Sequence, residues 1–356
     1  AQRRARRRAF GRTARHAAVP LAAAALLYAA AARLPIAPGA RDVVPAALFG
    51  LVAAGLAFAA RAHRATFALA VAAVLAGGAA GQRARAGGLL VRARSFYGAY
   101  TVRASATYHH LQHGNTLHGA QDTRPAYRRV PLTYYHAGGP LGALFARVPR
   151  LAEGAAPRRV GVVGLGTGSL ACWGRSGERW TFYEVDPLMA RLARDPRLFT
   201  YLRDCPPRST VVLGDARLRL AGAPQAAYDL LVLDAFSSDA IPTHLLTREA
   251  LALDVARLAP DGVLAVHVSN RYLDLVPVVA RLAGELGLAA AVGRDVSGAS
   301  RRHPFLTSSA WVALARTPAA LGTLPAAPGW RALPATRNGP AWSDDYTNVL
   351  AAVRWR

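Results

Sequence analysis

The apolar residues of this chain follow two different patterns, and the first occupies its N-terminal part. Three long apolar stretches, residues 17–34, 43–60 and 66–81, each approach the roughly 20 residues that cross a lipid bilayer. Because further apolar stretches follow the first one at once, we interpret them as membrane anchors rather than as a cleaved signal peptide. A buried helical bundle is the alternative, since Ala is only mildly apolar and Gly77 and Gly78 weaken the third stretch.

The second pattern begins at Arg158, where short apolar runs alternate with amphipathic stretches. This alternation favours parallel strands joined by crossover helices. The predicted strands are residues 160–163, 180–183, 210–213, 230–233 and 263–268, followed by a last pair near 289–292 and 310–315. The pattern therefore predicts an α/β fold with a Rossmann-like sheet.

The segments that follow the predicted strands carry glycine or acidic residues. The first strand runs into Gly164, Gly166 and Gly168, where the missing Cβ atoms allow a tight turn and close approach of a ligand. This G-x-G-x-G run is shorter than the pyrophosphate fingerprint of dinucleotide-binding folds. It therefore fits an adenosyl sulfonium, which has no phosphate, better than NAD. The second strand ends in Glu184 and Asp186, which can accept hydrogen bonds from ribose hydroxyls.

The third and fourth strands end in the same way. Asp215 and Ala216 follow the third strand and can lie beside an adenine amino group, while Asp234 follows the fourth at the predicted catalytic edge. Each acid could instead cap the next helix. The order of glycines and acids over four strand exits favours a methyltransferase-type domain that binds S-adenosylmethionine or its decarboxylated relative.

Composition and charge change this picture little. The formal net charge is +24, but the basic side chains are Arg and Ala is abundant, so much of the excess reflects biased composition. Short Arg runs beside an apolar helix more often set membrane topology than bind nucleic acid. The one clear cluster precedes the first apolar stretch and comprises Arg3, Arg4, Arg6, Arg7, Arg8, Arg12 and Arg15.

These Arg residues conflict with the number of apolar stretches. Arg-rich flanks favour the cytoplasm, which suits the N-terminal cluster and also residues 83–94. If both Arg-rich flanks lie in the cytoplasm, the chain between them must cross the membrane an even number of times. The sequence has three candidate stretches, which is an odd number. One stretch could be interfacial or re-entrant, or the chain could be a piece of a longer membrane protein. We expect an inner-membrane protein with its nucleotide domain in the cytoplasm, where its nucleotide is available.

Neither the cysteines nor the histidines indicate a metal site. Cys172 and Cys205 lack a C-x-x-C or Cys/His spacing, so we expect reduced structural thiols and no disulfide. Four histidines lie close together without a carboxylate or cysteine at ligand spacing, and we expect no metal there. They are His109, His110, His113 and His118.

Longer motifs lie outside the nucleotide-binding pattern. They are residues 113–121 (HGNTLHGAQ), 133–135 (TYY), 234–242 (DAFSSDAIP), 269–272 (SNRY) and 342–346 (WSDDY). With these motifs the chain resembles, from about Phe96 to its C-terminus, the spermidine synthase (polyamine aminopropyltransferase) family, particularly its membrane-fused bacterial branch.

The resemblance implies an architecture and a reaction. In that family a small β domain precedes the Rossmann-like domain, and residues 97–121, rich in Tyr, Thr, Val and Leu, suit such a domain. The donor would be decarboxylated S-adenosylmethionine, and the acceptor a diamine such as putrescine. Asp234 would accept a proton from the attacking amine. The implied substrate-binding residues are Gln121, Tyr134, Tyr135, Asp239 and Asp345.

Two departures from the family pattern concern the amine site. The family carries a Tyr-His-Glu stretch, whereas this chain has Ala137 after Tyr135 and His136. Its compact Asp-x-x-Asp-Pro motif is lengthened here, because Asp239 lies farther along and two residues separate it from Pro242. The resemblance therefore predicts an amine site whose geometry differs from that of the family.

We expect four segments. Residues 1–95 hold the Arg-rich N-terminus and transmembrane helices, 96–150 a small β domain, 151–320 the adenosyl-binding domain, and 321–356 a C-terminal segment, irregular at first, that returns to the site. The expected partners are a small-molecule amine and membrane lipid, not nucleic acid, with a homodimer as the assembly to test. The competing functions are an S-adenosylmethionine-dependent methyltransferase and a non-catalytic sensor of an adenosyl ligand.

Overall fold

The computed structural model describes residues 68, 88–114, 116–235, 242–334, 336 and 339–354. The chain divides into two compact units, residues 1–87 and 88–356, and the elements below belong to the second. Apart from residue 68, the three apolar stretches predicted to enter a membrane lie outside the described residues. Within the described part of the chain, no helix is long and apolar enough to cross a bilayer.

A small antiparallel sheet opens the second unit. Its strands follow in the order β1-β2-β3-β4, namely β1 (Leu89–Ser95), β2 (Gly98–Ser105), β3 (Tyr108–His113) and β4 (Thr116–Asp122). Tyr100, Val102 and Leu111 are buried on one face, where they pack against side chains from the α5 region such as Leu192 and Phe199. The sequence predicted a small β domain from residue 96, and the small sheet begins at Leu89.

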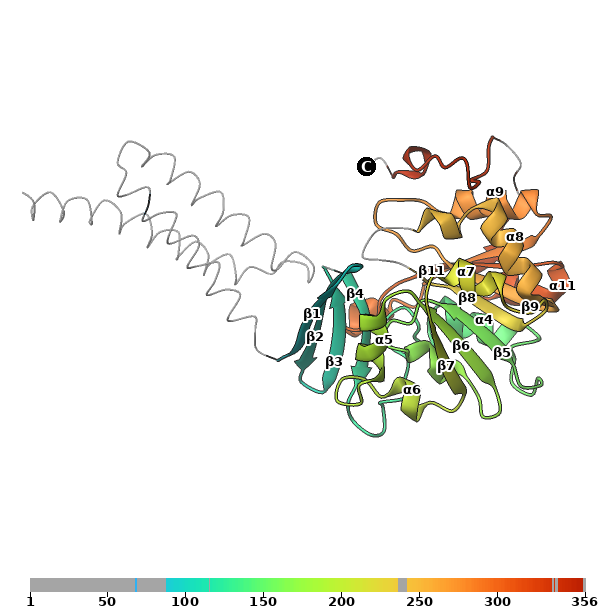
Figure 1. Ribbon diagram of the computed structural model, residues 1–356. Coiled ribbons are helices and arrows are strands. Elements are labelled where there is room, and N and C mark those ends of the chain that lie inside the picture. The colour runs from blue at the N-terminus through green and yellow to red at the C-terminus, as the bar shows by residue number, and fades with distance from the viewer. Residues whose placement is uncertain are drawn as a thin grey trace, which may run out of the picture. The chain divides into compact units, whose positions relative to one another are not determined.

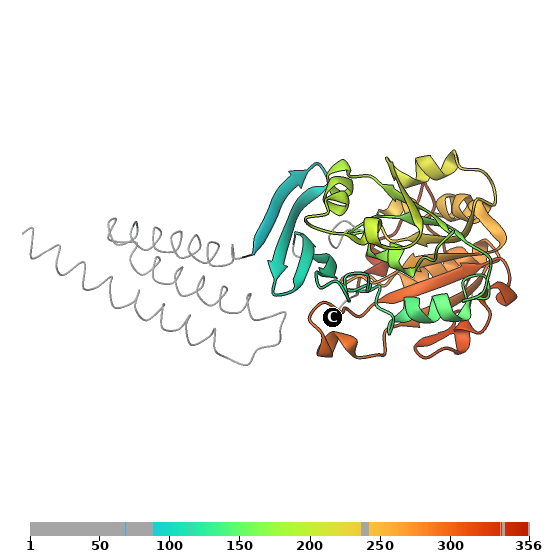
Figure 2. The same cartoon turned by 90° about the horizontal axis from the view of Figure 1, so that it is seen from below.

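An eight-stranded sheet forms the centre of the unit, in the order β12-β10-β11-β9-β8-β5-β6-β7. The neighbouring strands from β9 to β7 are parallel, and β11, β10 and β12 continue the sheet through antiparallel pairs. Both views show the small sheet beside one end of this larger assembly (Figure 1, Figure 2). The strands are β5 (Arg159–Val163), β6 (Arg179–Glu184), β7 (Arg208–Leu213), β8 (Tyr228–Leu233), β9 (Leu258–His267), β10 (Ala289–Arg294), β11 (Ala310–Ala315) and β12 (Trp330–Ala332).

Helices cover both faces of the large sheet, which is why β8 is buried along its whole length. One apolar core lies beneath α4 (Pro140–Arg147), the 3-10 helix η1 (Ser169–Trp173), α5 (Pro187–Arg194) and α11 (Pro318–Leu321). The other lies beneath α7 (Ala216–Ala221), α8 (Arg248–Arg257) and α9 (Val276–Glu285). The remaining short helices are α6 (Tyr201–Asp204), η2 (Thr243–Leu245), α10 (Ala299–Arg302), η3 (Leu324–Ala326) and η4 (Leu350–Ala352).

The structure corrects two expectations about the C-terminal segment. Residues 318–340 were expected to be an irregular connector, yet they supply α11, η3 and the edge strand β12. Trp342 was expected to return toward the site, but it is buried in the core beneath α7, α8 and α9, whereas Arg354 of the same segment does line the cavity. Apolar packing on the sheet therefore decides the path of this segment.

A third correction concerns the cysteines, which form a disulfide rather than two free thiols. Cys172 lies in η1 and Cys205 directly follows α6, and their Cα atoms are 4.9 Å apart. The residues are 33 positions apart in sequence. No local spacing announces the pair, because it depends on the packing of η1 against α6.

Candidate functional site

A cavity of about 1160 Å³ lies at the carboxyl edge of the parallel strands. The ends of β5, β6, β7, β8 and β9 line it, together with parts of the small sheet and the segment that carries Tyr134 and Tyr135. In an open α/β sheet this edge is where ligands bind, because the strand-to-helix turns leave backbone groups and side chains facing a crevice. The cavity is thus the candidate site.

The glycine-rich turn after β5 forms part of the wall. Gly164 has a φ of +97°, and a Cβ there would lie 2.1 Å from the backbone oxygen of Asp234. Gly166, with a φ of +53°, also lines the cavity. Gly168 does not: it has a φ of +80°, and a Cβ would collide with Leu202, so its glycine serves packing rather than ligand contact.

The acids after β6 lie in the same half of the cavity. Glu184 Oε2 accepts a hydrogen bond from Leu165 N–H (3.1 Å), and Oε1 accepts one from Asp186 N–H (2.8 Å). Burial raises the pKa of Glu184 despite these bonds. Asp186 accepts hydrogen bonds from Leu188 N–H and from Ser95 Oγ, so it caps α5 and also ties β1 to this part of the cavity wall. The carboxylates are held at the predicted edge by backbone amides.

Asp215 and Ala216 after β7 also line the cavity. Asp215 Oδ1 accepts from Leu218 N–H, which makes it the N-cap of α7, and Oδ2 lies 3.2 Å from His244 Nε2. Asp215 therefore both caps α7 and lines the cavity.

Asp234 follows β8 in the middle of the site. Its Oδ2 accepts a hydrogen bond from the Tyr135 hydroxyl, and its Oδ1 lies 2.7 Å from His267 Nδ1. The Asp234 side chain is 4% exposed. Burial acts to raise the pKa of Asp234, but His267 and the Tyr135 hydroxyl outweigh it and hold this pKa below its ordinary value. The carboxylate is therefore ionised at neutral pH.

His267, at the end of β9, is a site residue that sequence reasoning missed. Its ring stacks on Trp311, with centroids 4.5 Å apart, and lies beside the Tyr134 ring, with centroids 4.7 Å apart. Its Nε2 lies 2.8 Å from Ser269 Oγ. A polar residue at the end of a predicted strand, shortly before the SNRY motif, was the available signal.

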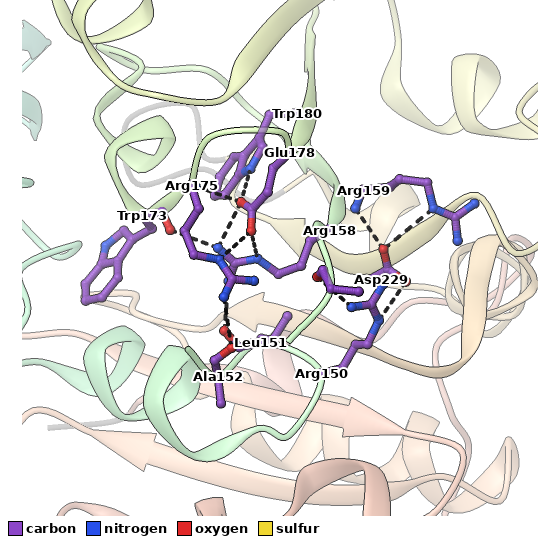
Figure 3. A network of polar contacts seen from close by, with 11 residues as sticks. Arg150, Leu151, Ala152, Arg158, Arg159, Trp173, Arg175, Glu178, Trp180 and Asp229 are labelled. Carbon is purple, nitrogen blue, oxygen red and sulfur yellow. Dashed lines mark hydrogen bonds and ion pairs between the residues drawn. The ribbon is translucent and has the colours of Figure 1, made fainter. Parts of the chain in front are cut away.

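Figure 3 shows a buried polar network around Glu178, and this network reaches the segment of Tyr135 through Trp173. Trp173 Nε1 donates to the Tyr135 carbonyl (2.9 Å), and Arg158 Nη2 donates to the Trp173 carbonyl (3.0 Å). Arg158 also makes two hydrogen bonds to Glu178, at 2.5 and 2.9 Å. The backbone that positions Tyr135 against Asp234 is thus anchored by an ion pair outside the cavity.

Histidines from the small sheet reach the cavity as well. His113 and His118 line it with their rings 5.3 Å apart, and Nε2 of His118 is buried without a hydrogen-bond partner. Burial lowers the pKa of His118 to about 4, so this side chain is neutral at pH 7. Within the described residues, no group of three or more His, Cys, Asp or Glu side chains is arranged to hold a metal ion.

The structure separates the predicted amine-binding residues. Tyr134 and Tyr135 line the cavity. Gln121 does not, because its amide bonds to Arg128 O and to Thr200, and Asp345 is exposed away from the cavity. These positions do not support the ligand contacts predicted for Gln121 and Asp345. Asp239 lies outside the described residues.

One carboxylate that the sequence did not single out lies beside His136, next to the position where the family pattern has Glu and this chain has Ala137. Asp295, which follows β10 and lines the cavity, has its Oδ2 3.2 Å from His136 Nε2, next to Ala137. Burial acts to raise the pKa of Asp295, but hydrogen bonds from Ser297 and His136 hold it below the usual range. A second ionised carboxylate is therefore present in the half of the cavity formed by β8 to β10.

Fold and site together define a Rossmann-like protein of the methyltransferase type, and comparisons with known proteins narrow the class. The chain is 34% identical over 117 residues to a polyamine aminopropyltransferase of Vibrio vulnificus, covering 31% of this chain and 38% of that protein. It is 36% identical over 168 residues to polyamine aminopropyltransferase 2 of Streptomyces coelicolor, covering 44% of this chain and 28% of that protein. The matches thus span well under half of each relative.

The fold comparison agrees with these matches. A probable spermidine synthase from Corynebacterium glutamicum superposes with a TM-score of 0.51 at 15% identity, covering 74% of this chain and 97% of that one. No protein-family model matches the chain. The chain is thus similar to polyamine aminopropyltransferases over part of its sequence, and its fold is similar to that of a probable spermidine synthase.

Proposed function

We propose that this protein transfers an aminopropyl group from decarboxylated S-adenosylmethionine to a small amine. The observation that carries the proposal is the position of Asp234. This ionised carboxylate stands between the glycine turn and acids of β5 to β7, which suit an adenosyl group, and the aromatic half of the cavity formed by Tyr134 and Tyr135.

The reaction requires a neutral nitrogen, because a protonated amine has no lone pair. The nitrogen attacks the aminopropyl carbon bonded to the sulfonium, the C–S bond breaks, and its electron pair neutralises the sulfur to give methylthioadenosine. Asp234 attracts the ammonium form and assists its loss of a proton, while the cavity aligns the two reactants. Tyr135 fixes the carboxylate through its hydroxyl.

The same carboxylate favours the decarboxylated donor. A group that reacts beside Asp234 must bring its sulfonium side arm close to a buried negative charge. S-adenosylmethionine would add a second carboxylate to that arm, and like charges in a poorly solvated site repel. The decarboxylated donor lacks this carboxylate and keeps the ammonium that both donors carry.

We propose a diamine such as putrescine as the acceptor, with Asp234 and Asp295 as the carboxylates that face it. Tyr134 and Tyr135 offer aromatic faces to a cation. Arg271 and Arg294 also line the cavity and would oppose a dication. An acceptor panel should therefore include diamines of different length, monoamines, and amines that carry a carboxylate.

The test measures donor binding by calorimetry with both forms of the donor, and then release of methylthioadenosine in the presence of each amine. We expect preference for the decarboxylated donor and amine-dependent release. Asp234→Asn should lower kcat by about a hundredfold or more while leaving donor binding near normal. Asp261→Asn is the matched control, because Asp261 is exposed near the opposite end of β9.

Other outcomes identify the competing functions. Preference for S-adenosylmethionine with methyl transfer would indicate a methyltransferase, and binding without turnover of any amine would indicate a sensor. Full activity of Asp234→Asn would remove this residue from the mechanism.

We further propose that the protein belongs to the membrane-fused branch and is anchored in the inner membrane with this domain on the cytoplasmic side. The three apolar stretches of the sequence and the cytoplasmic origin of the donor support the proposal. The disulfide weighs against it, since disulfides persist mainly in oxidising compartments. A C-terminal reporter that is active on only one side of the membrane tests the orientation, and light scattering in detergent tests for a homodimer.

A further inference from the structure

Both ring nitrogens of His267 are engaged within the catalytic part of the cavity. Nδ1 lies 2.7 Å from Asp234 Oδ1 and Nε2 lies 2.8 Å from Ser269 Oγ. The ring is 6% exposed and contacts the rings of Tyr134 and Trp311. Ser269 itself lines the cavity. Asp234, His267 and Ser269 therefore form a continuous hydrogen-bonded line that ends at the cavity surface.

The neighbours of this line fix where its protons lie. Ser269 Oγ accepts a hydrogen bond from Ala310 N–H (2.8 Å), which leaves its own hydrogen to be donated to Nε2 of a neutral His267. An ionised Asp234 requires a hydrogen on Nδ1. In the neutral state His267 is therefore the Nδ1–H tautomer, with the Nε2 lone pair turned toward Ser269. Protonation at Nε2 gives an imidazolium whose counter-ion is Asp234 and whose faces are covered by aromatic rings.

We propose that His267, reached through Ser269, is the group that stores the proton lost by the attacking amine. The proposal rests on the aminopropyl transfer proposed above. Asp234 then stays ionised throughout, orients the imidazole through Nδ1 and attracts the amine cation. The sequence analysis assigned both attraction of the amine and acceptance of its proton to Asp234, whereas here Asp234 attracts the amine and His267 accepts the proton.

The proton transfer is balanced without any further reactant. The ammonium gives a proton to Ser269 Oγ while the Ser269 hydroxyl gives its own proton to His267 Nε2. The products are the neutral amine, an intact serine and the imidazolium. Imidazole is the better acceptor on intrinsic grounds, since reference pKa values are about 6.5 for imidazole, about 3.9 for an Asp carboxyl and about 10.4 for an alkylammonium.

The titratable groups that face His267 differ in their charge at neutral pH. They are Asp234 after β8, His118 on β4, and Tyr134 and Tyr135 on the segment above the ring. Burial lowers the pKa of His118 to about 4 and raises those of Tyr134 and Tyr135 well above their ordinary values. At neutral pH His118 is therefore uncharged and both tyrosines are protonated, so Asp234 is the charged neighbour of His267 in this cluster.

The experiment has one readout without substrate and one with it. Nitrogen NMR of the full-length protein with labelled imidazoles, assigned with His267→Gln, should show His267 as the Nδ1–H tautomer when neutral. In the pH profile of kcat/KM, wild-type activity should fall on acidification in a way that depends on His267. His267→Gln should reduce kcat about a hundredfold or more and remove that fall. Ser269→Ala, which leaves the Asp234–His267 contact, should slow kcat similarly.

Matched controls separate this role from a structural one. His109→Gln changes a histidine that bonds Leu198 O away from the cavity and should keep both rate and profile. His244→Gln changes the histidine beside Asp215 in the donor half, and the imidazole-dependent fall should persist. An Nε2–H tautomer, or an acidic fall that survives in His267→Gln, would overturn the inference. Absence of turnover by wild-type protein with every amine would instead count against the proposed function, and the NMR result would still judge the tautomer.

Discussion

Replacement of Glu178 by Gln tests whether the network in Figure 3 supports the site. The Glu178 side chain is fully buried and Arg158 is 2% exposed. Glu178 accepts hydrogen bonds from Arg158, from Arg175 Nε (2.9 Å) and N–H (3.0 Å), and from Trp180 Nε1 (3.1 Å). Gln keeps the shape but removes the charge, and turns one acceptor into a donor that faces other donors.

The expected cost follows from this geometry. Removing one partner of a buried ion pair leaves the other charge uncompensated, which costs about 3–5 kcal/mol. Urea unfolding of Glu178→Gln should therefore show a free energy of unfolding lower by about that amount, with an unchanged m-value. A loss below about 1 kcal/mol would refute the reasoning, because surface ion pairs contribute no more than that.

The effect of Glu178 on the free energy of unfolding should depend on pH in a definite direction. Burial acts to raise the pKa of Glu178, but hydrogen bonds from Arg158, Arg175 and Trp180 outweigh it, so its folded pKa is below the ordinary value. The ionised carboxylate thus stabilises the fold above its unfolded pKa, and this contribution is lost as pH falls through the folded pKa. The stability gap between wild type and Glu178→Gln should accordingly narrow on acidification.

Three further variants test other features. Reduction of the Cys172–Cys205 disulfide, or its replacement by two serines, should lower the free energy of unfolding by about 4 kcal/mol, because the bridge joins residues 33 positions apart. Calorimetry measures this loss, and equal melting temperatures with and without the bridge would contradict it. Burial raises the pKa of Asp254 to about 8, so the folded state holds this proton more tightly than the unfolded one and stability falls as pH rises toward 8. Asp254→Asn should remove that slope and stabilise the protein at pH 8 by at most about 5 kcal/mol, and an unchanged slope would count against a buried acid. Gly164→Ala should abolish donor binding in calorimetry, whereas Gly154→Ala, also at positive φ but with open space around its Cβ position, should bind normally; equal binding by both would exclude a clash at the glycine turn.

The sequence predicted features that depend on local order. The strands from β5 to β11 and the acids at Glu184, Asp186, Asp215 and Asp234 follow from short-range patterns, because parallel strands bring their carboxyl ends to one edge. The β-rich segment before them was also predictable. For Asp186 and Asp215 the choice between helix cap and site was never exclusive, since each does both.

Features that depend on contacts between distant segments could not be predicted from the sequence. His267 gains its role from Asp234, 33 positions away in sequence, and from stacking on Trp311. Gln121 was assigned to the site by resemblance, but Thr200 and Arg128 O take up its amide. No short motif encodes such partners.

The disulfide also encloses part of the cavity wall in a covalent ring. Residues 172–205 run through β6 and α5 and carry Glu184 and Asp186, so both acids lie inside the closed loop. Arg197 lies in the same loop with its side chain 86% exposed, which makes it accessible to trypsin. A single cut there would leave two fragments joined through sulfur. They would migrate together on a gel without reductant and separate with it, so the same cut made on cell extracts would report whether the protein matures in an oxidising compartment.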